Sequence, residues 1–178
     1  MNHRLLRFIL NGGLIAYPTE SCYGLGCSPF LYKAITKINN LKNRARNKNF
    51  IIIGNELRQF DRLIKDMNTN EKKKLHNKWP GPHTWLINAN KKSPKWLTSS
   101  SKIALRIPSF MPCRRITKII NQPVISTSLN KSGKRPIKNY RDACRLFNGK
   151  VKIIKGQIGR NRKPSSIHDF STGIIYRD

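Results

Sequence analysis

Acidic residues are scarce in this chain of 178 residues, which has 8 Asp and Glu against 36 Lys and Arg and a formal net charge of +28. Such an imbalance favours polyanionic ligands such as nucleotides or RNA. The charge alone does not identify a ligand, because the chain is also rich in Asn and Ile and much of its lysine is equally well explained as a solvated surface. Net charge bears on solubility and non-specific binding, and it leaves fold and activity open.

Long hydrophobic runs and paired cysteines are also missing. No apolar run approaches the roughly 20 residues that a membrane helix requires, so we expect a soluble protein without membrane contact. The amino-terminal stretch lacks a small-residue cleavage site and is interpreted as a helix rather than a signal peptide. Cys22, Cys27, Cys113 and Cys144 form no C-x-x-C pair and have no His at zinc-finger spacing. We therefore expect no metal-ligating set and reduced thiols, which fits a cytoplasmic location.

Neither a repeat nor a linker rich in Gly, Ser or Pro divides the chain, so residues 1–178 are expected to form one domain. Short apolar runs bounded by Gly, Pro or Asn predict strands at 13–17, 50–54, 84–88, 102–107, 123–127 and 151–154. Apolar spacing near three and four predicts helices at 2–11, 30–42, 56–77 and 139–147. Because strands and helices alternate, the predicted class is α/β.

Two polar stretches are expected to be loops. Lys91–Lys95 is interpreted as a basic loop between strands. The segment 156–163 carries two glycines and three basic residues, and it is the predicted mobile loop, able to close over phosphates.

Basic side chains gather after the second predicted helix, at Lys42, Arg44, Arg46 and Lys48. Arg offers a planar fork and Lys a compact charge, which are complementary ways to hold phosphates. In a chain with 36 basic residues such a cluster also arises by chance. Spacing alone therefore favours the alternative of an ordinary solvated helix end.

A second polar segment, Ser126–Gly133, follows a predicted strand and places hydroxyl and amide groups at a sheet edge, where ligands often bind. Taken alone, an ordinary Asn-capped turn explains it better. Two nucleotide-binding motifs are excluded. Ser128 occupies the position of the first Gly of a Walker loop, and Pro29 occupies the position of the third Gly of a dinucleotide-binding fingerprint. No Ser, His and acid form a nucleophile elbow, so we expect no covalent catalyst.

Two of the few carboxylates, Glu20 and Asp169, fall inside candidate site segments. Each is a candidate ligand for a cation or an amine. The structural alternatives, a solvent-facing strand end for Glu20 and a turn former for Asp169, are equally open.

Four segments, in this order, resemble the YrdC-like family of threonylcarbamoyl-AMP synthases in its short bacterial form. They are the Tyr-Pro-Thr-acid segment at 17–20, the Lys-x-Arg pair at 42 and 44, the Pro-Gly-Pro-x-Thr turn at 80–84, and the Ser-x-Asn signature at 128 and 130. A Leu-Arg-x-Pro strand at 105–108 and a Pro-Ser-Ser-Ile stretch at 164–167 extend the likeness over nearly the whole chain. Ser28, Arg46, Asn49 and His168 depart from the family's usual residues, which affects affinity rather than class.

The resemblance implies a single-domain fold with a twisted open mixed sheet, flanked by helices, and a concave basic ligand cleft. It implies a nucleotidyltransferase that makes L-threonylcarbamoyladenylate and pyrophosphate from L-threonine, bicarbonate and ATP. The product serves the threonylcarbamoyl modification of adenosine 37 in ANN-decoding tRNAs. Mg²⁺ is expected with the ATP. Because the chain lacks the extra C-terminal domain of longer members, a separate threonylcarbamoyl transferase complex is the expected recipient of the adenylate.

The same resemblance implies the site residues. The expected catalytic residues are Lys42, Arg44, Ser128 and Asn130. ATP is expected to bind Lys42, Arg44, Lys48, Thr84, Ser128 and Arg177, and threonine or its carbamate to bind Thr19, Arg106, Ser126, Asn130 and Ser165. The alternative function is a non-catalytic RNA-binding or ribosome-associated protein with a basic concave surface, and direct tRNA contact is compatible with both functions.

Overall fold

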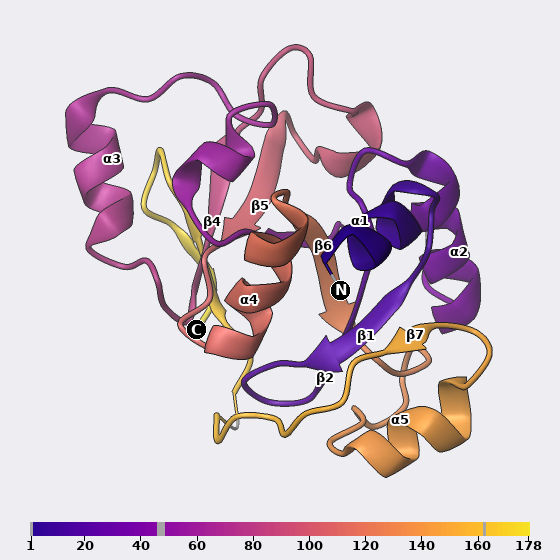
Figure 1. Ribbon diagram of the computed structural model, residues 1–178. Helices are drawn as coiled ribbons and strands as arrows, with labels where there is room; N and C mark the ends of the chain where they lie inside the picture. The colour runs from indigo at the N-terminus through magenta and orange to yellow at the C-terminus, as the bar shows by residue number, and fades with distance from the viewer. Residues whose placement is uncertain (1, 46–48, 162) are drawn as a thin grey trace.

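A mixed β-sheet forms the centre of the computed structural model, which describes residues 2–45, 49–161 and 163–178 (Figure 1). Within these ranges nine strands pair in the order β7-β1-β2-β6-β3-β5-β4-β8-β9. The pairs β1/β7, β3/β5 and β4/β8 are parallel and the other five are antiparallel. The strands are β1 (Ile15–Pro18), β2 (Tyr23–Gly26), β3 (Ile51–Ile53), β4 (His83–Asn88), β5 (Lys102–Arg106), β6 (Val124–Ser128), β7 (Lys152–Ile153), β8 (Ser166–Asp169) and β9 (Ile175–Arg177).

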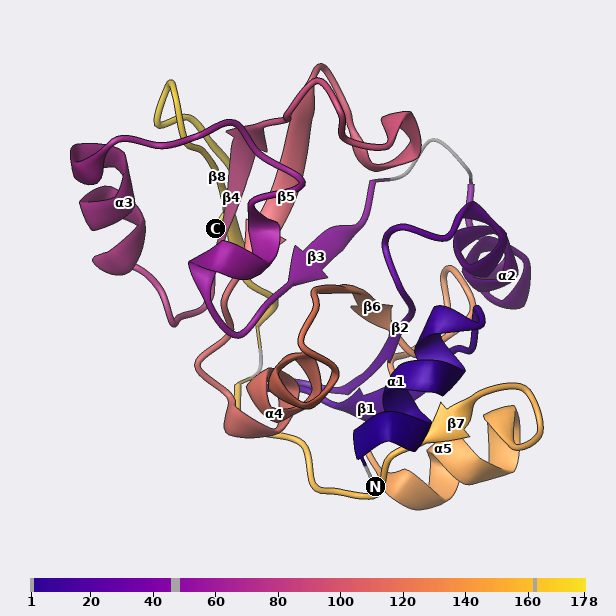
Figure 2. The same ribbon diagram turned by 45° about the horizontal axis from the view of Figure 1, so that its top comes forward.

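Five α-helices and two 3₁₀ helices surround the sheet in the described ranges. They are α1 (Asn2–Leu10), α2 (Tyr32–Lys42), α3 (Thr69–His76), α4 (Met111–Ile120), α5 (Tyr140–Phe147), η1 (Leu57–Phe60) and η2 (Lys95–Leu97). Helices α1 and α4 lie side by side, whereas α3 lies at the end of the molecule away from α2 and α5 (Figures 1 and 2). No helix in these ranges has the length and apolar character needed to cross a bilayer.

Side chains alternate between the two faces of the central strands. Ile15 and Tyr17 of β1 join one core cluster with Ile9 of α1 and Ile116 of α4. Ala16, between them, joins the larger cluster that includes residues of α2 and α5. This is the period of two that a strand imposes when both faces are covered. The predicted open, mixed sheet flanked by helices is therefore confirmed.

Most of the predicted elements are confirmed, since each of the six predicted strands overlaps an observed one and the helices at 2–11, 30–42 and 139–147 correspond to α1, α2 and α5. The loop Lys91–Lys95 does lie between β4 and β5, with η2 beginning at its last residue. The single helix predicted at 56–77 is wrong. Its middle turns back to the sheet, where Ile64 bridges Ala89 and the Lys65 amide donates to the carbonyl of Asn88.

A capping box explains why a separate helix, α3, begins within the interval 56–77. The side chain of Asn68 accepts from the Glu71 amide at 2.9 Å, and the Glu71 carboxylate accepts from the Asn68 amide at 2.8 Å. This reciprocal capping box fixes a helix start at Thr69. Four observed elements, β2, α4, β8 and β9, were not predicted. The sequence of β2 is Tyr-Gly-Leu-Gly, and its two glycines weaken the apolar pattern that predicts a strand.

Candidate functional site

A cavity of about 390 Å³ opens where several strand ends and loops converge. Its lining includes the turn after β1, the hydroxyl-bearing end of β6, the chain entering β3, and Arg106 and Pro108 at the end of β5. Asn161, residues of 163–167 and Arg177 of β9 also line it. These segments are distant in sequence, and the pairing of β6 with both β2 and β3 brings them together. A cleft at strand ends is where α/β sheets commonly bind ligands.

The charged groups that line this cavity are mostly cationic. Among the described residues they are Arg44, Arg106, Lys163 and Arg177, with Glu20 as the one carboxylate. Four cations around one opening favour an anionic ligand, and the guanidinium groups offer paired donors suited to phosphate or carboxylate.

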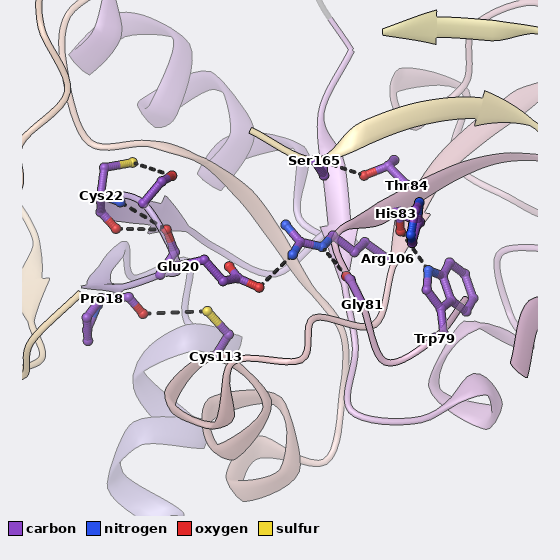
Figure 3. A network of polar contacts seen from close by, with 12 residues as sticks. Pro18, Glu20, Cys22, Trp79, Gly81, His83, Thr84, Arg106, Cys113 and Ser165 are labelled. Atoms are coloured by element: carbon purple, nitrogen blue, oxygen red, sulfur yellow. Dashed lines mark hydrogen bonds and ion pairs between the residues drawn. The ribbon is translucent and has the colours of Figure 1, made fainter. Parts of the chain in front are cut away.

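Arg106 and Glu20 form an ion pair inside the cavity wall (Figure 3). Nη2 of Arg106 lies 2.5 Å from Oε1 of Glu20, and Nε of Arg106 donates to the carbonyl of Gly81 at 2.9 Å. The side chains are only 12% and 11% exposed. Two of the donors of the guanidinium are thus engaged, which fixes its plane and leaves its remaining nitrogen to receive an anion.

Arg177, Ser165 and Thr84 form a second polar network at the cavity. Nε of Arg177 donates to the Ser165 carbonyl at 2.8 Å, and the hydroxyls of Ser165 and Thr84 lie 2.8 Å apart. Thr84 is fully buried and Ser165 lines the cavity (Figure 3). Burial and the neighbouring charge of Arg106 lower the pKa of Arg177. Thr84 therefore lies behind Ser165 and orients it.

The variant Thr84→Val tests this supporting role. Val keeps the shape but removes the hydroxyl that contacts Ser165 Oγ, so we expect about 1 kcal/mol less folding stability and a several-fold weaker interaction with any ligand held by Ser165. Thermal unfolding and ligand titration check both effects. Thr98→Val is the control, because the Thr98 hydroxyl reaches only its local carbonyl at the surface; an equal loss in both variants would contradict the role.

Arg44 lies at the cavity between α2 and β3. Its Nη2 donates to the Asn49 carbonyl at 2.6 Å, and its guanidinium carbon lies 4.7 Å from the centre of the Phe50 ring. Its Nε is buried without a hydrogen-bond partner among the described residues. Burial lowers the pKa of Arg44. A stacked arginine with an unused donor is well suited to bind an incoming anion.

Lys42 is the last residue of α2, which ends there because Asn43 adopts a left-handed conformation with φ 49°. The side chain is buried, at 2% exposure, and does not line the cavity. Its Nζ donates to the carbonyls of Ser128 and Asn130, the latter at 2.6 Å, and its own carbonyl accepts from the Ser132 amide. Lys42 therefore holds the segment after β6 from behind.

The hydroxyls at the end of β6 are held from below as well. The buried Tyr17 hydroxyl donates to Ser126 Oγ at 2.8 Å. Across the sheet, Thr19 Oγ1 donates to the Cys22 carbonyl at 2.8 Å and closes the turn from β1 to β2. These bonds orient Ser126 and Thr19 where each lines the cavity.

The structure brings together seven of the residues that the sequence predicts for the site. The cavity is lined by Thr19, Arg44, Arg106, Ser126, Ser128, Ser165 and Arg177. Lys42, Thr84 and Asn130 do not line it, and the Asn130 amide instead donates to the carbonyls of Lys131 and Lys134. Lys48, and with it Arg46, lies outside the described residues.

Other lining residues are absent from the predicted set, among them Cys22, Cys113, Asn161 and Lys163. Burial raises the pKa of both cysteine thiols. Asn161 and Lys163 belong to the predicted mobile loop, and there the amides of Gly159 and Asn161 donate to the carbonyls of Thr19 and Glu20. The motion predicted for this loop stays a prediction.

Asp169 does not line the cavity. Its carboxylate is buried, pairs with Lys102 and accepts from the amides of Ser171 and Thr172. Burial would raise the pKa of Asp169, but these hydrogen bonds outweigh it and the pKa is lowered. Of the two interpretations of Asp169, the turn former is therefore the observed one, and the carboxylate is already engaged by these partners. No group of three or more His, Cys, Asp or Glu in the described ranges is placed to hold a metal ion.

Comparison with known proteins gives a consistent match. The Sua5/YciO/YrdC family model, with the description "Telomere recombination", matches residues 7–178. The threonylcarbamoyl-AMP synthase of Methylobacillus flagellatus is 37% identical over 97% of this chain and 97% of its own length. The enzyme of the same name from Neisseria gonorrhoeae is 42% identical over 96% of this chain and 91% of its own length.

Solved structures agree on the fold. P. abyssi Sua5 complexed with L-threonine superposes with a TM-score of 0.83 at 26% identity, covering 95% of this chain and 51% of that one. The present chain thus spans about half the length of Sua5. E. coli YciO superposes with a TM-score of 0.78 at 23% identity over 100% of this chain and 90% of its own, which supports the fold alone.

Proposed function

The chain belongs to the Sua5/YciO/YrdC family, and from this premise we propose that it is a threonylcarbamoyl-AMP synthase. It converts L-threonine, bicarbonate and ATP into L-threonylcarbamoyladenylate, pyrophosphate and water. The observation that carries the proposal is the cavity itself, in which four cations and the hydroxyl-bearing end of β6 surround one paired carboxylate. It supports an enzyme that brings two anionic substrates together.

The chemistry needs this arrangement, because a carbamate oxygen must approach the α-phosphorus of ATP while both partners carry negative charge. Fixed guanidinium groups offset that repulsion without reorganising during the reaction. Attack by the carbamate oxygen forms the P–O bond, and pyrophosphate leaves with the electron pair of the bond that breaks. Positioning and electrostatics suffice, so no protein nucleophile is required.

The substrates are proposed to divide the cavity between them. Arg44 and Arg177, with Ser128, hold the triphosphate, and Lys163 adds charge at the same opening. Arg106 holds the threonine carboxylate with its remaining nitrogen, while Thr19, Ser126 and Ser165 hold the polar groups of threonine or its carbamate.

Two other predicted residues act from behind the cavity wall. Lys42 positions the carbonyls of Ser128 and Asn130, and Thr84 positions Ser165. Both are proposed as positioning residues, because neither lines the cavity.

Mg²⁺ is proposed to accompany ATP. The oxygen-bearing side chains that line the cavity in the described ranges are hydroxyls, the amides of Asn49 and Asn161, and the carboxylate of Glu20, whose Oε1 already pairs with Arg106. Such a set fits Mg²⁺ that arrives on the phosphates and keeps several of its waters, rather than a site built from protein carboxylates. When bound, Mg²⁺ would neutralise charge on the triphosphate, and Glu20 would be its candidate carboxylate partner in this chain.

The partners of the reaction are proposed on chemical grounds. An acyl-adenylate is labile in water, so a separate transferase that consumes it for tRNA is the expected recipient. Direct contact with tRNA is compatible with the net charge of +28. The competing function, RNA binding without turnover, rests on that charge alone.

Pyrophosphate release tests the proposal. With ATP, Mg²⁺ and bicarbonate, we expect release that depends on L-threonine and falls about 100-fold in Arg44→Ala, through loss of transition-state charge stabilisation. The control is Arg141→Ala, because Arg141 is an exposed residue of α5 outside the cavity. A folded protein that releases no pyrophosphate, yet binds tRNA with a steep salt dependence, would support the RNA-binding alternative instead.

A further inference from the structure

A second concave surface lies between α1 and α4, outside the cavity described above. It encloses about 730 Å³ and is lined by these two helices, by Pro18 and by segment 152–157. We call it the α1–α4 groove. None of its lining residues also lines the catalytic cavity.

The floor of the groove is apolar. Leu5, Ile119 and Ile154 are partly buried and pack on the core cluster shared by α1, α4 and the sheet. Met111 stands at one end of the floor with 63% of its surface exposed. An exposed methionine beside a continuous apolar floor is adaptable and is characteristic of surfaces that bind other chains.

The rim of the groove is cationic. Arg4, Arg115 and Lys155 are exposed and come from three different elements. Their side chains make no hydrogen bond or ion pair within the described part of the chain, and no carboxylate of that part lines the groove. The fourth rim cation, Lys152, lies 5.6 Å from the centre of the Phe8 ring. The positive charge of the rim is therefore unopposed.

The lining residues of α4 form a regular row. Met111, Arg115 and Ile119 follow one another at intervals of four, so they lie along one side of the helix beside the groove. Eight residue steps at the helical rise extend this row over about 12 Å. A second helix laid against it can bury an apolar stripe on the floor while its flanking acidic side chains reach the rim.

We propose that the α1–α4 groove binds an acidic amphipathic helix of a partner protein. A single anionic head group, as on a lipid or fatty acid, pairs with one cation and leaves the others unopposed. Several carboxylates on one rigid helix match cations spread over α1, α4 and segment 152–157. The apolar floor of the groove matches an apolar stripe that runs along the partner helix between its carboxylates. This inference is independent of the reaction proposed above.

The groove adjoins the catalytic cavity through the chain after β7. The Ile154 amide donates to the carbonyl of Ala16, and the Tyr23 hydroxyl donates to the carbonyl of Gly156 at 2.7 Å. Four residues beyond Gln157, Asn161 lines the cavity. On α4, Cys113 lines the cavity while its neighbour Pro112 lines the groove. A partner in the groove therefore lies beside the wall of that cavity.

A designed peptide tests the groove without knowledge of the natural partner. The probe is a fluorescent peptide of about four helical turns with Leu at i, i+3, i+4 and i+7 and Glu at most other positions. We expect saturable binding by fluorescence anisotropy, and binding about tenfold weaker for a scrambled peptide of identical composition that has no apolar face. A peptide with Lys in place of Glu is expected not to bind.

Matched variants locate the binding. Arg115→Glu is expected to weaken the peptide about tenfold, whereas Lys118→Glu, the same charge change at an exposed position of α4 outside the groove, changes it less than about twofold. Met111→Glu is paired with Leu146→Glu, because Leu146 is an exposed apolar residue on α5 outside the groove. All four substituted residues are exposed, so we expect the variants to fold. Circular dichroism checks this.

Three results would overturn the proposal. Equal affinity for the amphipathic and scrambled peptides, or equal losses in Arg115→Glu and Lys118→Glu, would mean that only the overall charge of the chain attracts the peptide. Binding of phosphatidylglycerol vesicles that depends on Arg115, without peptide binding, would assign the groove to an anionic lipid surface instead.

Discussion

Replacing Arg106 with Met lowers kcat/KM for L-threonine by about 1000-fold, the largest loss that we expect from any single substitution. The guanidinium is proposed to hold the threonine carboxylate, and it also pairs with Glu20 and donates to the Gly81 carbonyl. Met retains the apolar stem but removes every donor. The buried Glu20 carboxylate then has no charged partner, so we also expect about 3 kcal/mol less folding stability.

A double variant separates the two effects of this substitution. Adding Glu20→Gln removes the unpaired charge, so stability recovers for the most part while turnover does not. Steady-state kinetics with varied threonine and chemical denaturation measure the two quantities. Arg58→Met is the matched control, because Arg58 pairs with Glu56 at 2.8 Å on the exposed surface. Such a pair contributes at most about 1 kcal/mol, and no kinetic effect is expected. A threonine KM and kcat within about threefold of wild type in folded Arg106→Met would refute the assignment.

The elements that the sequence predicted well are those whose apolar pattern is local, such as a short strand that is buried along its whole length. Strand β1 alternates Ile15, Ala16 and Tyr17 between two covered faces, and its composition alone indicates a strand. The interval 56–77 has helical spacing throughout, but backbone pairing of Ile64 with Ala89 outweighs it. Pairing with a strand more than twenty residues away is a tertiary interaction, which a local pattern does not contain.

Contacts within the site show the same limit. The sequence indicated Arg106 and Glu20 as separate candidate site residues. Their ion pair joins residues 86 apart, so no local sequence pattern predicts it. For Lys42 a signal did exist. Ile35, Ile38 and Lys42 are spaced by three and four on α2, and all three are buried. The helical period therefore places Lys42 on the core-facing side, beneath the cavity rather than in it.

The burial of Lys42 also predicts how stability depends on pH. Burial, and then the charge of Arg44, lower its pKa from 10.5 to about 8. Between these two values the unfolded chain binds more protons than the folded one, so the free energy of unfolding contributed by this group rises with pH. Below about pH 8 the amine is charged in both states, so the cost of burying that charge is present in full and this group adds no pH dependence to stability. A neutral amine still has two hydrogens to donate to the carbonyls of Ser128 and Asn130.

In Lys42→Met both carbonyls lose their donor, and we expect kcat to fall about 300-fold because the segment that carries Ser128 is no longer fixed. Lys37→Met is the control on the same helix, since its Nζ donates to the Gly12 carbonyl at 3.2 Å from an exposed position. Pyrophosphate release measures kcat, and denaturation between pH 7 and about 9.5 measures the difference in unfolding free energy between wild type and variant, which should grow as pH rises. If Lys42 instead contacted ATP directly, ATP KM would rise and the pH-dependent difference in stability would be absent. A loss of turnover together with that growing difference identifies a positioning residue, because only a buried amine bound to the β6 segment produces both.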